Sequence, residues 1–368
     1  MHKSLLSFHL KTGVYKNIGD YIQLIAARQF ALTSEFIDQS ELAQYNGPVT
    51  KMIMNGWFMH CPQSFPPSKN IVPLWLSVHF TPSKIDEILR PECIRYLREF
   101  EPIGCRDYWT VRALERRGVK AYYSSCLTLT LGLSYNHTGA KDRIAFVDPL
   151  LPMTGERIID IVRHKGFLRY VLKNFMGSFR VGRKLQAHLL PHTSGLKGWI
   201  TRLVFGCAFL KTYEEMFTRE TILDADFCTN YVEWSSLDGL SNVDEQFIKI
   251  ADAQLHRFEE YKYVVTSRIH CALPCLAMGT PVVFVDDKLK RKCGARLDLS
   301  DGRLDGVLPF FNVMCYGENW KLVSEFDHGN ERLSPKSIVP IANNWRPFAE
   351  SLKAKCRSFI DDESVSDV

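Results

Sequence analysis

The sequence lacks the long apolar runs that mark membrane-spanning proteins. No window comes near the ~18 uninterrupted apolar residues that a transmembrane helix needs. The opening stretch, MHKSLLSFHLKTG, has too short and too polar an apolar run for a secretory signal, and no small-residue cleavage site follows it. We therefore expect a cytoplasmic location.

Cysteine spacings that would indicate a disulfide framework or a zinc site are also missing. The 11 cysteines are odd in number and irregularly spaced. No CxxC pair and no His/Cys cluster with zinc spacing occurs, so we expect neither a structural metal nor a metal cofactor. Cys271 and Cys275 lie four positions apart and are expected to be small buried side chains.

Acidic residues are absent from the segment Lys165–Lys211, which makes it strongly basic. Its cations are Lys165, Arg169, Lys173, Arg180, Arg183, Lys184, Lys197, Arg202 and Lys211. Aromatic and aliphatic residues are interleaved with them, as in elements that lie at an anionic membrane surface. A core helix pair with a solvated basic face gives the same pattern, and both interpretations stay open. Nucleic acid is not expected as a partner, because no nucleic-acid-binding module accompanies the charge.

The remaining features are those of a folded protein with two α/β domains. A chain of 368 residues with 46% hydrophobic and 24% charged residues suits two globular domains. Strands alternate with amphipathic helices, which predicts parallel, doubly wound sheets. We expect two Rossmann-like domains across a cleft, at residues 1–140 and 141–342, and a C-terminal helix and tail at 343–368.

The expected elements follow from hydrophobic periodicity and turn residues. Strands are predicted at 51–58, ending in a polar turn at Asn55-Gly56, and at 70–80, 102–105, 119–125, 142–147, 263–266 and 282–285. Helices are predicted at 21–30, 93–100, 106–118, 242–260, 268–278 and 343–360. Gly118 and Gly279 are expected to end two of these helices.

The turn Thr266–His270 is the first candidate site. Ligands of open parallel sheets bind beyond the carboxyl ends of strands, where helix N-termini offer unpaired N–H groups. Arg268 can hold a phosphate or carboxylate through two hydrogen bonds, and His270 can transfer protons near neutral pH. Pro274 cannot donate a hydrogen bond to the carbonyl of His270, which leaves that carbonyl available to a ligand.

A second candidate is the strand end Gly104–Asp107. Arg106 is positioned to reach the cleft, with Asp107 as a helix N-cap or as its charge partner. A purely structural pair between Arg106 and Asp107 is the alternative. Further polar residues at predicted strand or turn ends, considered for an acceptor substrate, are Asn17, Asp20, Asn55, His60 and His79.

Five segments, in this order, resemble the polysaccharide pyruvyl transferase family. They are NIGDYIQLIAARQF (17–30), MNGWF (54–58), GCRDYWTVRALERRGV (104–119), SSCLTLTL (124–131) and VVTSRIHCALPCLAMGTPVVFV (264–285). The family's usual Arg-Leu-His motif corresponds to Arg268-Ile269-His270 here. Residues 146–238 carry few of the family's patterns, which leaves the acceptor open.

The resemblance implies a GT-B-like fold and transfer of pyruvate from phosphoenolpyruvate to two hydroxyls of a sugar, as a ketal, with release of phosphate. It implies that Arg106, Ser267, Arg268, Ile269 and His270 bind phosphoenolpyruvate and that Arg268 and His270 act in catalysis. No cofactor is implied beyond the donor itself. The glycan acceptor is either free or linked to a nucleotide or lipid, and a lipid-linked one would place the enzyme at the inner face of the membrane through residues 165–211.

Two other functions remain open from the sequence. A glycosyltransferase of the same architecture would bind a nucleotide-sugar, with Asp286 or Asp287 placed to hold the ribose. A non-catalytic scaffold at a membrane surface would use only the basic segment.

Overall fold

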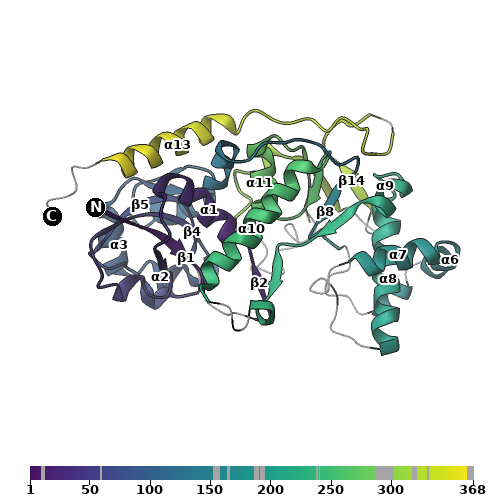
Figure 1. Cartoon of the computed structure of the whole chain (residues 1–368), viewed down its shortest axis with the longest axis horizontal. Coiled ribbons are helices and arrows are strands. Elements are labelled where there is room, and N and C mark those ends of the chain that lie inside the picture. The colour runs from purple at the N-terminus through teal and green to yellow at the C-terminus, as the bar shows by residue number, and fades with distance from the viewer. Residues whose placement is uncertain are drawn as a thin grey trace.

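The chain forms a mixed α/β protein with two six-stranded sheets and a small two-stranded ribbon between them (Figure 1). The computed structural model describes residues 1–9, 13–58, 60–151, 158–163, 166–185, 190, 195–237, 239, 241–286, 302–316, 321–329 and 331–362. Both sheets are built mainly from parallel strands, as the alternation of strands and helices predicts.

The first sheet is parallel throughout, in the order β3-β1-β4-β5-β6-β7. Its strands are β1 (His2–Ser7), β3 (Phe36–Asp38), β4 (Thr50–Phe58), β5 (Ile71–Phe80), β6 (Ile103–Cys105) and β7 (Ala121–Tyr123). Its helices are α1 (Gly19–Ala31), α2 (Ile85–Ile88), α3 (Pro91–Glu99) and α4 (Tyr108–Glu115). The central strands β4 and β5 are buried along most of their length, which explains their nearly continuous apolar sequence.

One predicted turn is wrong. The strand predicted at 51–58 was expected to end in a turn at Asn55-Gly56. Instead, β4 continues to Phe58 through a shift in its pairing with β5 between Met54 and Gly56. The Asn55 side chain is buried, and its Nδ2 donates a hydrogen bond to the carbonyl of Gln23 in α1 (2.9 Å). Asn55-Gly56 therefore lies in a β-bulge within the strand and not in a turn at its end.

The second sheet has the order β14-β13-β12-β11-β8-β9 and is parallel except for β14 at its edge. Its strands are β8 (Ala145–Val147), β9 (Asp226–Cys228), β11 (Val264–Thr266), β12 (Val282–Asp286), β13 (Asn312–Tyr316) and β14 (Leu322–Ser324). Helices α9 (Arg219–Asp224), α10 (Val243–Glu260) and α11 (Ile269–Met278) accompany it. Gly279 ends α11 in the left-handed conformation, as expected from its position.

Several elements connect the two sheets. Strand β2 (Tyr15–Asn17) pairs antiparallel with β10 (Tyr231–Glu233), so a ribbon joins residues far apart in sequence. Helix α13 (Arg346–Asp361) runs back from the second sheet to the first, along the top of Figure 1. One hydrophobic core contains Leu5 and Ile53 of the first sheet together with Val264 of the second. The predicted boundary between residues 140 and 141 lies between β7 and β8 and stays a prediction.

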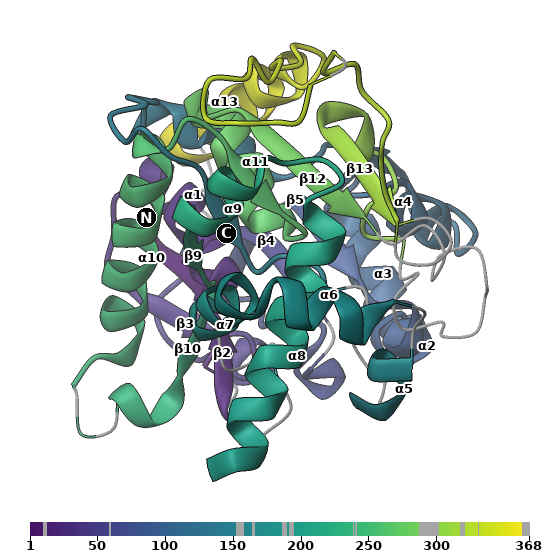
Figure 2. The ribbon, with the colours of Figure 1, turned by 90° about the vertical axis from the view of Figure 1, so that its right-hand side faces the viewer.

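The basic segment forms helices that project from the second sheet (Figures 1 and 2). They are α6 (Phe167–Lys173), α7 (Phe175–Lys184) and α8 (Gly195–Tyr213), preceded by α5 (Ile158–Arg163). Helices α7 and α8 pack so closely at Gly182 that a Cβ there would lie 2.1 Å from the Arg202 carbonyl oxygen. Glycine at this position therefore allows the close approach. Lys165 lies outside the described residues. Within the part of the chain that the structure describes, no helix is long and apolar enough to cross a membrane.

Candidate active site

The carboxyl edges of the two sheets meet at a contact between Arg106 and His270. Arg106 directly follows β6 of the first sheet, and His270 lies in the first turn of α11, just after β11 of the second. Arg106 Nη1 lies 3.1 Å from His270 Nε2. Because parallel sheets bind ligands at their carboxyl edges, this contact marks the place where both sheets can act on one molecule.

Arg106 is a buried cation without a charge partner among the described residues. Its side chain is 1% exposed, and Nη1 also donates a hydrogen bond to Gln23 Oε1 (3.3 Å). Among the described residues, no carboxylate lies within ion-pair distance of Arg106, and Nε has no hydrogen-bond partner. Burying a charge costs free energy unless it is paired. The guanidinium is therefore suited to receive an anion.

Asp107 does not serve Arg106, so the structural pair considered from the sequence is absent. Asp107 Oδ1 accepts a hydrogen bond from the backbone N–H of Thr110 (2.8 Å), which makes it the N-cap of α4. Its Oδ2 lies 2.6 Å from Nδ1 of His79, and both side chains are fully buried. Asp107 thus fixes the His79 ring and does not pair with Arg106.

His270 is held as a neutral imidazole. Burial lowers its pKa well below the ordinary value, and the nearby Arg106, Arg303 and His79 add to this effect. Since a guanidinium only donates hydrogen bonds, Nε2 must accept from Arg106, and the proton of the neutral ring sits on Nδ1. His270 is the sequence-predicted residue that the structure places closest to Arg106.

The N-terminus of α1 packs directly against His270. A Cβ at Gly19 would lie 3.0 Å from His270 Nδ1 and 3.0 Å from Asn17 Oδ1. Asn17 Oδ1 accepts a hydrogen bond from the Gly19 N–H (2.9 Å), and the Ile18 N–H donates to the Asn230 carbonyl (2.7 Å). The predicted turn at Asn17–Asp20 therefore sits between the two sheets, and a larger residue at Gly19 would press on the His270 ring and the Asn17 side chain.

Arg268 has its side-chain contacts with Tyr231 and Asp148. It is the N-cap residue of α11, which has no side-chain cap, and its guanidinium lies over the Tyr231 ring of β10 (5.2 Å to the centroid). Its Nε is 4.0 Å from Oδ2 of the buried Asp148. Ser267 Oγ donates a hydrogen bond to the Asp148 carbonyl (2.9 Å), while Ile269 is buried in the core. Ile269 can reach a ligand only through its backbone.

Two of the residues considered for the acceptor line a common pocket at the carboxyl edge of the first sheet. The pocket is lined by Phe8, Lys16, Asp20, Asp38, Gln39, Trp57, His60 and Cys61. Asp20 pairs with Lys16 (3.1 Å). Burial lowers the pKa of His60, and the nearby carboxylate of Asp20 offsets only part of this effect. The Trp57 ring lies 6.3 Å from that of His60 and 6.0 Å from that of His79. Asn55 and His79 are buried and do not line this pocket.

Sequence reasoning missed several residues of this region. Lys16 directly precedes the quoted segment that begins at Asn17, and Trp57 lies within the quoted segment MNGWF, so both positions were within reach. Gln23 gave no signal, because a single polar residue on the buried face of α1 becomes informative only when its partner is known. Arg303 and Asp148 lie in stretches without a motif.

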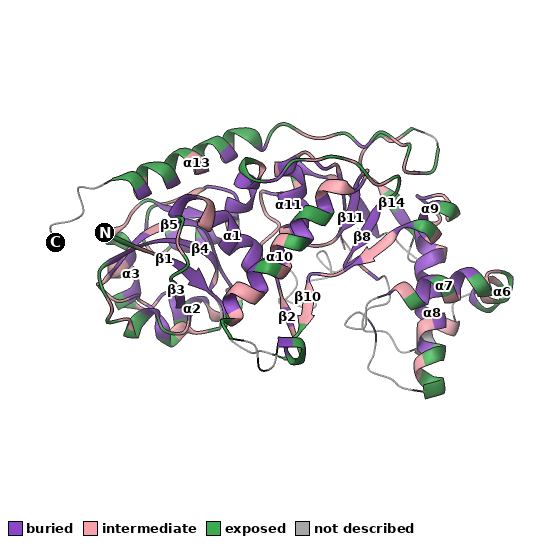
Figure 3. Ribbon diagram, viewed as in Figure 1, coloured by how far each residue is buried: buried purple, intermediate pink, exposed green. Residues whose placement is uncertain are grey.

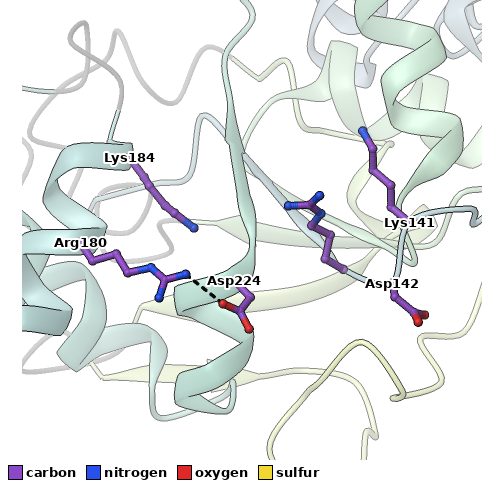
Figure 4. Close-up of a pocket in the computed structure, with 6 residues that line it drawn as sticks. Lys141, Asp142, Arg180, Lys184 and Asp224 are labelled. Atoms are coloured by element: carbon purple, nitrogen blue, oxygen red, sulfur yellow. Dashed lines mark hydrogen bonds and ion pairs between the residues drawn. The ribbon is translucent and has the colours of Figure 1, made fainter.

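A larger cavity of 420 Å³ lies at the opposite edge of the second sheet (Figure 4). Lys141, Asp142 and Arg143 precede β8, and Asp224 precedes β9, so the cavity is at the amino ends of these strands. Its cations already have partners: Arg143 binds Asp226, Arg180 binds Asp224, and Lys184 donates to two backbone carbonyls. This cavity is not part of the candidate active site.

Comparison with known proteins confirms the resemblance seen in the sequence. The family model described as polysaccharide pyruvyl transferase matches residues 17–175. The match includes Asn17, Asp20 and Arg106 and extends into residues 146–175, where the sequence reading found few family patterns. The segment with Arg268 and His270 lies outside it. No curated protein and no solved structure matches the chain.

Proposed function

We propose that the chain is a pyruvyl transferase that moves pyruvate from phosphoenolpyruvate to two hydroxyls of a sugar in a polysaccharide or glycan precursor. The observation that carries the proposal is Arg106, a buried guanidinium with no carboxylate partner among the described residues. It belongs to the part of the chain that matches the family model. A donor with a phosphate and a carboxylate would supply the missing negative charge.

In this proposal the donor lies between Arg106 and the start of α11. The uncapped N-terminus of a ten-residue helix offers backbone N–H groups and a positive dipole end to the phosphate. Arg268, next to the same helix start, would leave the Tyr231 ring and Asp148 to bind the donor. Two sheets and two guanidinium groups would then hold one small anion, consistent with a GT-B-like arrangement.

The reaction consists of proton transfers and two additions at one carbon. The methylene carbon of phosphoenolpyruvate takes up a proton, and a sugar hydroxyl forms a bond to C2 and loses its own proton. Phosphate leaves with the electrons of the C2–O bond, and the second hydroxyl closes the ketal and releases another proton. One proton has been taken up at carbon and two have been released from hydroxyls. The leaving phosphate accepts the remaining proton.

His270 is our candidate for the proton on carbon. Burial and the neighbouring Arg106 lower its pKa and favour the neutral ring. A bound phosphate brings negative charge to the same helix end and raises the imidazole pKa, so that the loaded enzyme would carry the proton that the empty enzyme lacks. Asp20, which lines the pocket with His60 and pairs with Lys16, is our candidate to accept a proton from a sugar hydroxyl.

A nucleotide-sugar glycosyltransferase is the competing function. Asp286 ends β12 and is buried, whereas Asp287 lies outside the described residues. Arg106 favours the pyruvyl transferase, since the chain from 17 to 175 that carries it matches that family.

Product analysis separates the two functions. The protein is incubated with phosphoenolpyruvate and a panel of free and lipid-linked galactosides and mannosides, and phosphate release and ketal formation are followed together. We expect both in equal amounts. A panel that yields neither product, while a nucleotide-sugar is turned over to free nucleotide, would establish the glycosyltransferase instead. Turnover of either kind excludes the scaffold.

A further inference from the structure

The projecting helices α6, α7 and α8 expose an unusual number of apolar side chains. Leu172, Met176 and Leu196 are 83%, 75% and 74% exposed, respectively. The complete exposed set on these helices is Leu168, Leu172, Phe175, Met176, Leu196, Trp199 and Ile200. Scattered exposed leucines are ordinary in soluble proteins, but a group of this size on neighbouring elements indicates a contact surface. We call these residues the apolar tip.

The apolar tip belongs to one packed unit. Helix α6 runs directly into α7 through Asn174, the C-cap of the first and the N-cap of the second. The Trp199 ring of α8 lies 6.0 Å from that of Phe175 and 5.8 Å from that of Phe179 in α7. Figure 3 shows exposed residues along α6 and at the free end of α8, away from both sheets. These helices therefore present exposed residues away from the two sheets.

Unpaired cations surround the apolar tip. Arg169, Lys173 and Lys197 are exposed, and none has an ion pair or hydrogen bond from its side chain among the described residues. Deeper in the unit, by contrast, Arg180 pairs with Asp224 and Lys184 donates to the carbonyls of Leu223 and Ala225. No Asp or Glu occurs anywhere from residue 165 to 211. Among the described residues, the cations next to the tip therefore have no ion pair, as is also true of Arg183 and Lys211.

We infer that the apolar tip inserts into the surface of an anionic lipid bilayer while Arg169, Lys173 and Lys197 contact lipid phosphates. Apolar side chains flanked by cations are the features of an interfacial element. A second copy of the chain fits less well, because a symmetric contact would bring the same uncompensated cations together. The inference is independent of the proposed reaction, since it concerns only helices outside the candidate active site.

The cations and the apolar side chains should each contribute measurably to binding of the anionic bilayer. A basic residue near an anionic surface strengthens binding about fivefold, equivalent to about 1 kcal/mol, so neutralising three should weaken it by about 100-fold. This part should disappear as salt screens the charges. Three apolar side chains contribute through burial, which salt does not screen, and removing them should weaken binding at least as much.

Sedimentation with lipid vesicles tests the inference on the full chain. The vesicles contain phosphatidylcholine alone or mixed with phosphatidylglycerol, each at low and at high salt. The charge variant combines Arg169→Gln, Lys173→Gln and Lys197→Gln, and its matched control combines Lys69→Gln, Arg116→Gln and Lys336→Gln. The apolar variant combines Leu172→Ser, Met176→Ser and Leu196→Ser, and its matched control combines Val49→Ser, Val323→Ser and Ile338→Ser, all at exposed positions.

We expect the unmodified protein and both controls to sediment with the anionic vesicles and both tip variants to stay in solution. All substituted side chains are exposed, so circular dichroism and melting temperature should be unchanged. Failure of the unmodified protein to bind, or binding that the tip variants leave intact, overturns the inference. A dimer in sedimentation velocity that the apolar variant dissociates would assign the tip to a second copy and overturn it as well.

Discussion

Replacing His270 with Gln should make the protein less sensitive to mild acid. The native state holds His270 neutral because burial, Arg106, Arg303 and His79 all disfavour the imidazolium. The unfolded chain has no such restraint and binds a proton at the ordinary pKa of about 6.5. Protonation therefore favours the unfolded state, and stability is lost as pH falls through this value and recovered as pH rises.

The size of the effect follows from proton linkage. Between about pH 7.5 and about pH 5.5, a histidine that titrates only in the unfolded state removes about 1.4 kcal/mol from the free energy of unfolding. The unmodified protein should lose this amount in addition to whatever the His270→Gln variant loses, because Gln binds no proton. Urea denaturation at both pH values and constant ionic strength measures the two losses.

His256 provides a control of opposite sign. A hydrogen bond to Glu259, helped by Asp252, raises its pKa, so protonation stabilises the native state at low pH and this is lost as pH rises. A His256→Gln variant should therefore be more sensitive to acid than the unmodified protein. Equal losses for the unmodified protein and the His270→Gln variant would refute a buried neutral His270 and, with it, the proposed uptake of a proton on donor binding.

Three further substitutions test the candidate site, each scored by turnover and by stability. Arg268→Lys keeps the charge but loses the two-point geometry, so turnover should fall by about 100-fold if Arg268 binds the donor, and near-normal turnover would remove it from the site. Gly19→Ala should lower turnover by displacing the His270 ring while leaving urea stability equal or higher, since Ala favours the helix; an unchanged rate would show that the contact can relax. Arg106→Leu removes an unpaired buried charge, so melting temperature should hold while the shift induced by phosphoenolpyruvate disappears; a retained shift would place the donor elsewhere.

The strands and helices could largely be predicted because each carries its own local signal. The nearly unbroken apolar run of β5 and the Gly279 end of α11 are examples, and both elements lie where the sequence placed them. The bulge in β4 could not be predicted, since Asn55-Gly56 is as compatible with a turn as with a bulge until β5 lies beside it. The path of α13 back to the first sheet is also a long-range property with no local sign.

The candidate site also combines features that have a local sequence signal with features that depend on long-range packing. Arg106 and His270 were each identified from their places at a strand end and a helix start, which is local information. Their contact joins residues 164 positions apart, and no single sequence specifies it. The position of the Arg268 guanidinium over the Tyr231 ring also depends on a distant segment, because Tyr231 belongs to β10. Which cation contacts His270 is therefore decided by packing and not by the motif.

The return of α13 to the first sheet has a consequence for biosynthesis. Ala349, Leu352 and Cys356 of α13 join the same core as Leu5 and Ile53, and Lys51 donates to the carbonyl of Phe359 (2.7 Å). On the ribosome, the strands of the first sheet and α1 emerge early, but α13, which completes the core that they share, is made after the whole second sheet. Nascent chains therefore carry an incomplete core through most of translation, and chaperone dependence should concentrate in the first half of the chain.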